Sequence, residues 1–159
     1  MPGCCPVGGI KRGIARAGIK RPGRKDIVVF ELAPETRVAG IFTRNQFCAA
    51  PVVLSRRHLS QDAPRYLLIN TGNANAGTGE RGLADAAACC EALAKEAGIS
   101  ASQVLPFSTG VIGEPLPVSK ILSSLPAALC ETREPRWAEA RPRHKTPRPR
   151  HQGRLRARG

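Results

Sequence analysis

Two segments rich in Asn and Gly hold the residue types best suited to chemistry. The first is N-T-G-N-A-N-A-G-T-G at residues 70–79, and the second is S-T-G-V-I-G-E at residues 108–114. Each directly follows a short apolar run, residues 67–69 and residues 104–107 respectively. Glycine allows a backbone to approach a ligand closely. We therefore expect the functional site where these two strand-to-loop transitions lie.

Thr109 and Gly110 are the candidate catalytic residues. Thr109 carries a hydroxyl and Gly110 a backbone N–H beside it, in a turn of small residues that leaves room for a substrate. Two such donors aimed at one point form an oxyanion hole, which stabilises the negative charge that develops during acyl transfer. A Thr-Gly sequence after a strand is also common as a plain turn. Chemistry alone leaves both interpretations open.

The segment at residues 70–79 does not have the pattern of a nucleotide-binding loop. No Lys-Ser or Lys-Thr follows its glycines, and G-x-G-x-x-G is missing, so neither a Walker loop nor a dinucleotide fingerprint is present. Asparagine side chains readily bond to nearby backbone. We expect the asparagines of this segment to hold its own backbone rather than a phosphate.

The histidine and cysteine patterns indicate no catalytic or metal site. His58 has no nucleophile near it in sequence, and we expect a solvent-facing side chain without a role. The six cysteines include two adjacent pairs and no C-x-x-C, whereas zinc ligands usually come about two to four residues apart. We expect reduced thiols, cytoplasmic localisation and no metal, with Cys89 and Cys90 serving as packing residues.

The elements that must position the loops follow from apolar spacing. We expect residues 7–25 to be extended and to lie along a sheet edge. The strands expected at residues 27–32 and 38–43 should pair antiparallel, because the connection between them is short. Glycine-led turns and a Ser-to-Gln capping box separate the later elements. The expected strands are residues 27–32, 38–43, 51–54, 67–69 and 104–107, and the expected helices are residues 81–97 and 116–128, with a brief helix starting at 55–58.

The charge is concentrated at the two ends of the chain. Of the 159 residues 42% are apolar, and the net charge is +13. Residues 1–25 contain seven Lys or Arg and no acid, and residues 131–159 contain ten against three acids, so the middle is nearly neutral. We expect a basic approach segment at 1–25, a folded portion at 26–130 and a disordered Pro/Arg tail at 131–159. No apolar run reaches the roughly 20 residues of a membrane span.

Four motifs resemble the glutamate N-acetyltransferase family, the ornithine acetyltransferases of arginine biosynthesis. They are A-G-I-F-T-R-N-Q at 39–46, A-A-P-V-V-L-S-R at 49–56, N-T-G-N-A-N-A-G-T-G-E-R-G-L-A-D-A at 70–86 and S-T-G-V-I-G-E-P-L-P at 108–117. The likeness is collinear from about residue 18 to residue 128. It does not extend over residues 129–159.

The resemblance implies an α/β fold, an α+β sandwich like that of the DmpA-type aminopeptidases, incomplete here, with a mixed sheet packed by helices. It also implies a precursor that cuts itself before a threonine in a K-G-A-T segment. That threonine, on the second or beta chain of a hetero-oligomer, would take acetyl from N-acetylornithine and pass it to glutamate. Thr109 and Gly110 match the oxyanion hole of the family. The ornithine route implies no cofactor, and acetyl-CoA is the donor in bifunctional members.

The chain departs from the family at the nucleophile. It contains no K-G-A-T and no M-T-T-D-T, and Thr132 and Thr146 lie in the tail without that context. We therefore expect a truncated N-terminal portion that is inactive alone, with a tail read out of frame. The alternatives are a non-catalytic partner of an intact family member, or a nucleic-acid-binding protein acting through its basic ends.

Overall fold

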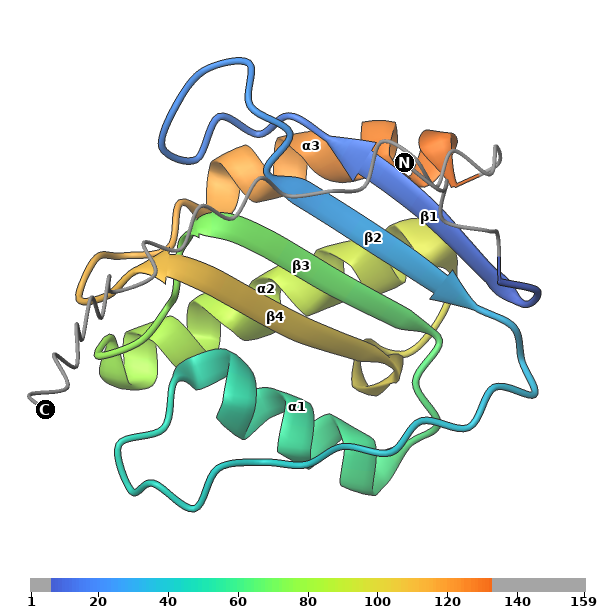
Figure 1. Ribbon diagram of the computed structural model, residues 1–159, viewed down its shortest axis with the longest axis horizontal. Helices are drawn as coiled ribbons and strands as arrows, with labels where there is room; N and C mark the ends of the chain where they lie inside the picture. Colours follow the sequence, from blue (N-terminus) through green and yellow to red (C-terminus); the bar gives the residue numbers. More distant parts are fainter. Residues whose placement is uncertain (1–6, 133–159) are drawn as a thin grey trace, which may run out of the picture.

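The computed structural model describes residues 7–132, which form one sheet and the helices around it (Figure 1). The strands are β1 (Ile10–Ala15), β2 (Ile27–Leu32), β3 (Tyr66–Asn73) and β4 (Val104–Val111). The helices are α1 (Ala50–Gln61), α2 (Gly79–Ala97) and α3 (Val118–Glu131), with a single 3₁₀ turn, η1 (Ala101–Gln103), before β4.

The sheet is mixed, with its strands in the order β1-β2-β3-β4. Strand β2 runs antiparallel to both β1 and β3, while β3 and β4 run parallel. Parallel strands need a long crossover, and α2 provides it. The expected α/β class, a mixed sheet packed by helices, is confirmed. The expectation that residues 7–25 lie along a sheet edge is confirmed for residues 10–15, which form the edge strand β1, whereas residues 16–25 form the loop that leads to β2.

Helices α2 and α3 cover one face of the sheet, and α1 lies beside the outer edge of β4 (Figure 1). The core between sheet and helices is aliphatic, and Ile27, Val29, Leu93, Ile121 and Leu125 are each at most 1% exposed. Small side chains along α2 let it pack closely, since Ala86, Cys89, Cys90 and Ala94 are all buried there. The other face of the sheet carries no helix among residues 7–132.

The predicted limits of the later helices agree well with the structure. Helix α2 ends at Ala97, and Gly98 follows in the left-handed conformation with φ 68°. Ser100 and Gln103 form the expected capping box, in which the Ser100 N–H donates to Gln103 Oε1 at 3.2 Å. Helix α3 starts after Pro117, two residues later than predicted.

Two of the predicted strands are wrong. Residues 38–43 form irregular backbone, with Ile41 fully exposed, because both edges of β2 are already paired with β1 and β3. The expected antiparallel pair with residues 27–32 is therefore not formed. Residues 51–54 instead lie in the first turns of α1, where Pro51 loses no hydrogen bond. Short apolar runs do not distinguish strand from helix by periodicity.

Candidate functional site

The two glycine-rich segments meet at the ends of the parallel strands. In the register of β3 and β4, Asn70 pairs with Ser108, Thr71 with Thr109, and Gly72 with Gly110. The carboxyl ends of parallel strands point to the same edge of a sheet, where α/β proteins commonly bind ligands. The structure thus brings together the two segments that the sequence singled out.

Gly110 requires its residue type because the two strands are very close there. Its φ is 142°, and a Cβ built on it would lie 2.4 Å from the Gly72 carbonyl carbon and 2.6 Å from the Asn73 nitrogen. Gly72 has a φ of 103°, which also favours glycine. The strand register shifts at the next position, Asn73. A side chain at residue 110 or residue 72 would therefore prevent the backbone beside Thr109 from taking this conformation.

Three buried asparagines hold the two loops together. Asn70 Nδ2 donates to the Asn73 carbonyl oxygen at 2.9 Å, and the Ser108 hydroxyl donates to Asn70 Oδ1 at 2.6 Å. Asn73 Nδ2 donates to the carbonyl oxygens of Glu114 and Pro115, at 3.2 and 3.0 Å. These bonds join residues 70–79 to residues 108–115 without any ligand.

Asn75 completes this network with a fully buried side chain in the left-handed region, at φ 48°. Its N–H donates to Asn73 Oδ1 at 2.7 Å, its Nδ2 donates to the Gly82 carbonyl oxygen at 2.8 Å, and its Oδ1 accepts from Thr78 Oγ1 at 2.8 Å. The expectation that the asparagines hold backbone is confirmed. Asn75 also ties the start of α1 to this loop, since Ala50 N–H donates to its carbonyl oxygen at 3.2 Å.

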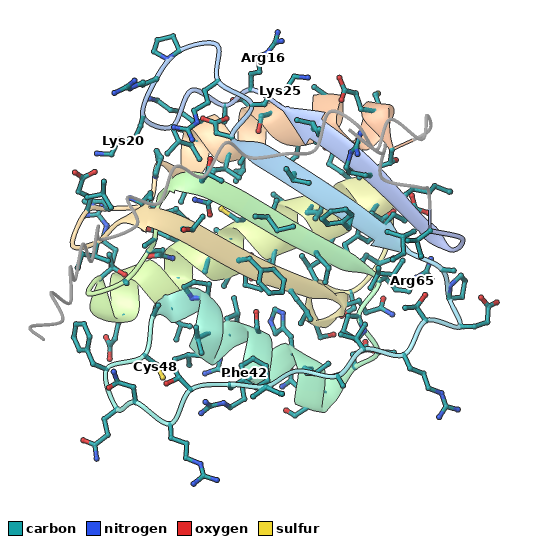
Figure 2. All side chains as sticks on the ribbon, in the orientation of Figure 1. Arg16, Lys20, Lys25, Phe42, Cys48 and Arg65 are labelled. Atoms are coloured by element: carbon teal, nitrogen blue, oxygen red, sulfur yellow. The ribbon has the colours of Figure 1, made fainter. Side chains whose placement is uncertain are left out.

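The β1–β2 loop packs against the same strand ends, which the sequence did not predict. Asp26 is 2% exposed, and its carboxylate accepts from the N–H groups of Ala17 and Ile19 at 2.7 and 2.6 Å. The loop so shaped places Ile19 and Lys20 over Gly72, and Lys20 forms an ion pair with Glu114. Figure 2 shows Lys20 on this loop together with two further basic residues, Arg16 and Lys25. Asp26 directly precedes the apolar run at residues 27–32, and this pattern did not predict a role for it in the sequence.

Thr109 lies on the sheet face that α2 and α3 leave uncovered. Side chains alternate along a strand, so Thr109 shares a face with Phe107, which is 43% exposed, while Ser108 points to the buried Asn70. A cleft of about 330 Å³ borders Phe107 and Ser108, between β4, α1 and residues 41–43. Thr109 itself is half-buried, and its neighbour Ser108 lines that cleft.

His58 is buried, so the prediction of a solvent-facing side chain is wrong. It is 7% exposed, and its Nδ1 lies 2.7 Å from the Val104 carbonyl oxygen. Ser55 lies on the same helix as His58, and its hydroxyl donates to the Pro106 carbonyl oxygen at 2.9 Å. Both side chains satisfy carbonyl groups on the outer edge of β4. His58 therefore packs against the start of β4 and satisfies a carbonyl group there, whereas Thr109 lies near the end of that strand.

The thiols of α2 are suited to packing and not to nucleophilic chemistry, as expected. Cys89 and Cys90 are 3% and 0% exposed. Burial, and then the nearby Asp85 carboxylate, raises the pKa of Cys89 to about 12. Burial likewise raises the pKa of Cys90, with smaller contributions from Cys89 and Glu91. Thiolates are the reactive form, so both side chains are inert near neutral pH.

Within residues 7–132, no three His, Cys, Asp or Glu side chains lie together in a way that could hold a metal ion. None of the helices in this part of the chain is long and apolar enough to cross a membrane. The expected disordered tail, apart from Glu131 and Thr132, lies outside the described residues.

The chain is similar to known proteins over most of its length. The model of the ArgJ family matches residues 11–142. The arginine biosynthesis bifunctional protein ArgJ of Pseudomonas syringae pv. tomato is 59% identical over 140 residues, and that of Methylococcus capsulatus is 55% identical over 136 residues. These matches cover 88% and 86% of this chain but 34% and 33% of the relatives. The chain spans about a third of the length of the curated relatives it matches.

Two solved structures have a fold similar to that of this chain. An ornithine acetyltransferase from Mycobacterium tuberculosis, complexed with ornithine, superposes with a TM-score of 0.73 at 35% identity, covering 83% of this chain and 70% of that one. The arginine biosynthesis bifunctional protein ArgJ from Bacillus halodurans gives a TM-score of 0.69 at 32% identity, covering 74% and 61%.

Fold and site together define an α/β protein with a paired glycine turn at the ends of two parallel strands. The relatives show which protein of that class it is similar to. The chain belongs to the ArgJ family.

Proposed function

We propose that this chain supplies the N-terminal part of a glutamate N-acetyltransferase, or ornithine acetyltransferase, which transfers acetyl from N-acetylornithine to glutamate in arginine biosynthesis. The observation that carries the proposal is the close pairing of Gly110 with Gly72 beside Thr109, in a chain of the ArgJ family. The names of the relatives, and the ornithine bound to one of them, point to the same amino-acid chemistry.

In the proposed reaction, a threonine hydroxyl from the second chain attacks the acetyl carbonyl of N-acetylornithine. A tetrahedral oxyanion forms, and the Thr109 hydroxyl and Gly110 N–H donate hydrogen bonds to it. The carbon–nitrogen bond then breaks, the leaving amine of ornithine takes the proton that the threonine hydroxyl gives up, and the acetyl group remains as a threonine ester. The amine of glutamate attacks this ester through a second oxyanion at the same donors, which releases N-acetylglutamate and restores the threonine.

The same donors would serve autocatalytic cleavage, because cutting a peptide bond by a hydroxyl also develops a tetrahedral oxyanion. The ornithine route involves acyl exchange between two amines and calls for no coenzyme or metal. Acetyl-CoA would be the donor if the enzyme is multifunctional, as the word bifunctional in the names of the relatives suggests. We place the enzyme in the cytoplasm, in keeping with its amino-acid substrates.

The uncovered face of the sheet is the surface we assign to the second chain. The half-buried Leu67 and Ile69 alternate with buried residues of β3 and pair with Leu105 and Phe107 on β4. An apolar sheet face is stable in water only when another layer covers it. Assembly on this face would bring the threonine of the second chain next to Thr109, which lies on the same face.

The experiment uses a chimaera in which residues 1–132 of this chain are followed by the remainder of the Pseudomonas syringae relative. We expect it to form N-acetylglutamate from N-acetylornithine and glutamate. Thr109→Val should lower kcat by about 100-fold to 1000-fold, as the loss of one oxyanion donor does. Thr36→Val, in the β2–α1 connection, is the matched control and should leave kcat unchanged. An inactive chimaera, or an active Thr109→Val variant, contradicts the proposal.

A further inference from the structure

Thr71 is a buried polar residue at the strand ends to which the reaction above gives no role. It is 6% exposed, and its Oγ1 makes no hydrogen bond to any of residues 7–132. A hydroxyl buried in this way loses its hydration without compensation, which lowers stability. The buried asparagines around it, Asn70, Asn73 and Asn75, are all hydrogen-bonded. An unpaired hydroxyl beside so complete a network indicates a partner that the resting site does not provide.

The sheet places Thr71 directly beside Thr109. The two residues are register partners on neighbouring parallel strands. Side-chain alternation puts Thr71 on the face of Ile69, and Thr109 on the same face with Phe107, the register partner of Ile69. Neighbouring strands of a sheet lie about 4.8 Å apart, so two threonine side chains on the same face can bring their hydroxyls within hydrogen-bonding distance by a change of rotamer.

The backbone of Thr71 is held in position from both sides. Its N–H donates to the Asp26 carbonyl oxygen at 2.9 Å, and Gly72 after it lies under Ile19 and Lys20. The β1–β2 loop and the Asp26 carboxylate thus limit how far Thr71 can move. A rotation of one of the two threonine side chains is a much smaller change, since hydroxyl rotamers interconvert readily.

We propose that Thr71 is a positioning residue of the acetyl-transfer site, whose hydroxyl donates a hydrogen bond to Thr109 Oγ1 while Thr109 donates its own hydrogen to the acyl oxygen. A threonine hydroxyl can donate one hydrogen bond and accept others at the same time. In a chain of hydrogen bonds each donor polarises the next, so Thr71 would orient Thr109 and strengthen its bond to the oxyanion. The inference rests on the proposed function and adds a residue to it.

The test replaces Thr71 by valine, which has the same shape and no hydroxyl. In the chimaera we expect Thr71→Val to lower kcat about tenfold with KM unchanged, the effect of one hydrogen bond made in the transition state. Thr71→Ser should keep kcat within about twofold, because it retains the hydroxyl. In the chain of residues 1–159, Thr71→Val should unfold at the same or a higher urea concentration, because an unpaired buried hydroxyl is removed.

Lower activity together with undiminished stability is the signature that a merely structural threonine would not give. Because Thr71 acts through Thr109, adding Thr71→Val to Thr109→Val should cause no further loss of kcat. The inference is overturned if Thr71→Val keeps full kcat, if it lowers the stability of residues 1–159, if Thr71→Ser loses as much activity, or if the two losses multiply. These outcomes in an active chimaera leave the proposed function standing, whereas a chimaera without acetyl transfer removes both.

Discussion

At the scale of single residues, the site depends on common polar side chains that are buried and held in uncommon backbone conformations. Asparagine bonds to backbone in many loops, but Asn75 does so while fully buried and at φ 48°. It satisfies the Gly82 carbonyl group and the Thr78 hydroxyl at once. The residue therefore holds the first turn of α2 against the loop that pairs with Thr109.

Asn75→Ala should destabilise the chain by about 3 kcal/mol, because two buried polar groups lose their partners and alanine is strained at positive φ. Urea unfolding of residues 1–159, followed by circular dichroism, measures this change. The control is Asn45→Ala, which removes a similar bond, from the Phe47 N–H at 2.9 Å, in an exposed loop. That variant should cost less than about 1 kcal/mol. Equal effects of the two substitutions would contradict the structural role of Asn75.

At the scale of elements, α1 covers an edge of the sheet and α2 packs on one of its faces. Helix α1 protects the outer edge of β4, where Ser55 and His58 satisfy the carbonyl groups of Pro106 and Val104. An unprotected edge strand would invite pairing with other chains. Helix α2 packs on the sheet through alanine and cysteine, so its two buried thiols are part of the core.

The thiols of α2 predict a loss of stability in alkali. Below about pH 9 a thiol is protonated in both states, since its ordinary pKa is 9.0. Above that pH the unfolded chain releases the proton, while folded Cys89, with its pKa raised to about 12, retains it. The folded state then binds more protons, so stability falls as pH rises. Urea unfolding should show a fall of about 1 kcal/mol per thiol between pH 9 and pH 10.

A double variant, Cys89→Ala with Cys90→Ala, should have lower stability at neutral pH but a flatter dependence between pH 9 and pH 10. Cys130→Ala, which removes an exposed thiol, is the control and should keep the slope of the unchanged protein. A slope that is the same in all three proteins would show that other groups titrate in this range.

At the scale of the whole molecule, α2 and α3 cover one face of the sheet, and no helix of residues 7–132 covers the other (Figure 1). Thr109, Thr71 and Phe107 belong to the face without helices, so the site and the surface assigned to the second chain are continuous. The match with the Pseudomonas syringae relative covers 34% of that protein, so the ArgJ relative is more than twice as long as this chain. Its additional length is ample for a layer that covers such a face.

Phe107→Lys tests this assignment. Phe107 is 43% exposed, so we expect the variant of residues 1–159 to unfold within about 1 kcal/mol of the unchanged chain and to self-associate less, as measured by light scattering. In the chimaera the same charge would be buried against the second layer, and acetyl transfer should be lost. Val53→Lys, on the outside of α1 at 37% exposure, is the control. A fully active Phe107→Lys chimaera would contradict this surface.

Much of the fold could be predicted from the sequence. The strand at 27–32, the limits of α2, the left-handed Gly98 and the capping box at Ser100 all follow from local rules, in which a residue acts on neighbours within a few positions. Thr109 and Gly110 as an oxyanion hole stay a prediction, now with a backbone geometry that suits it. The domain boundaries at residues 25 and 130 likewise stay predictions.

Tertiary structure alone decided the rest. Whether residues 38–43 form a strand depended on β1 occupying the free edge of β2, and whether residues 51–54 join a helix depended on α1 covering β4. His58 became buried for the same reason. Asp26, Lys20 and Thr71 entered the site through contacts between residues far apart in the chain, which no local pattern records. Sequence by itself determined the local conformations and the residue types at the strand ends, and packing between distant elements determined which of them meet.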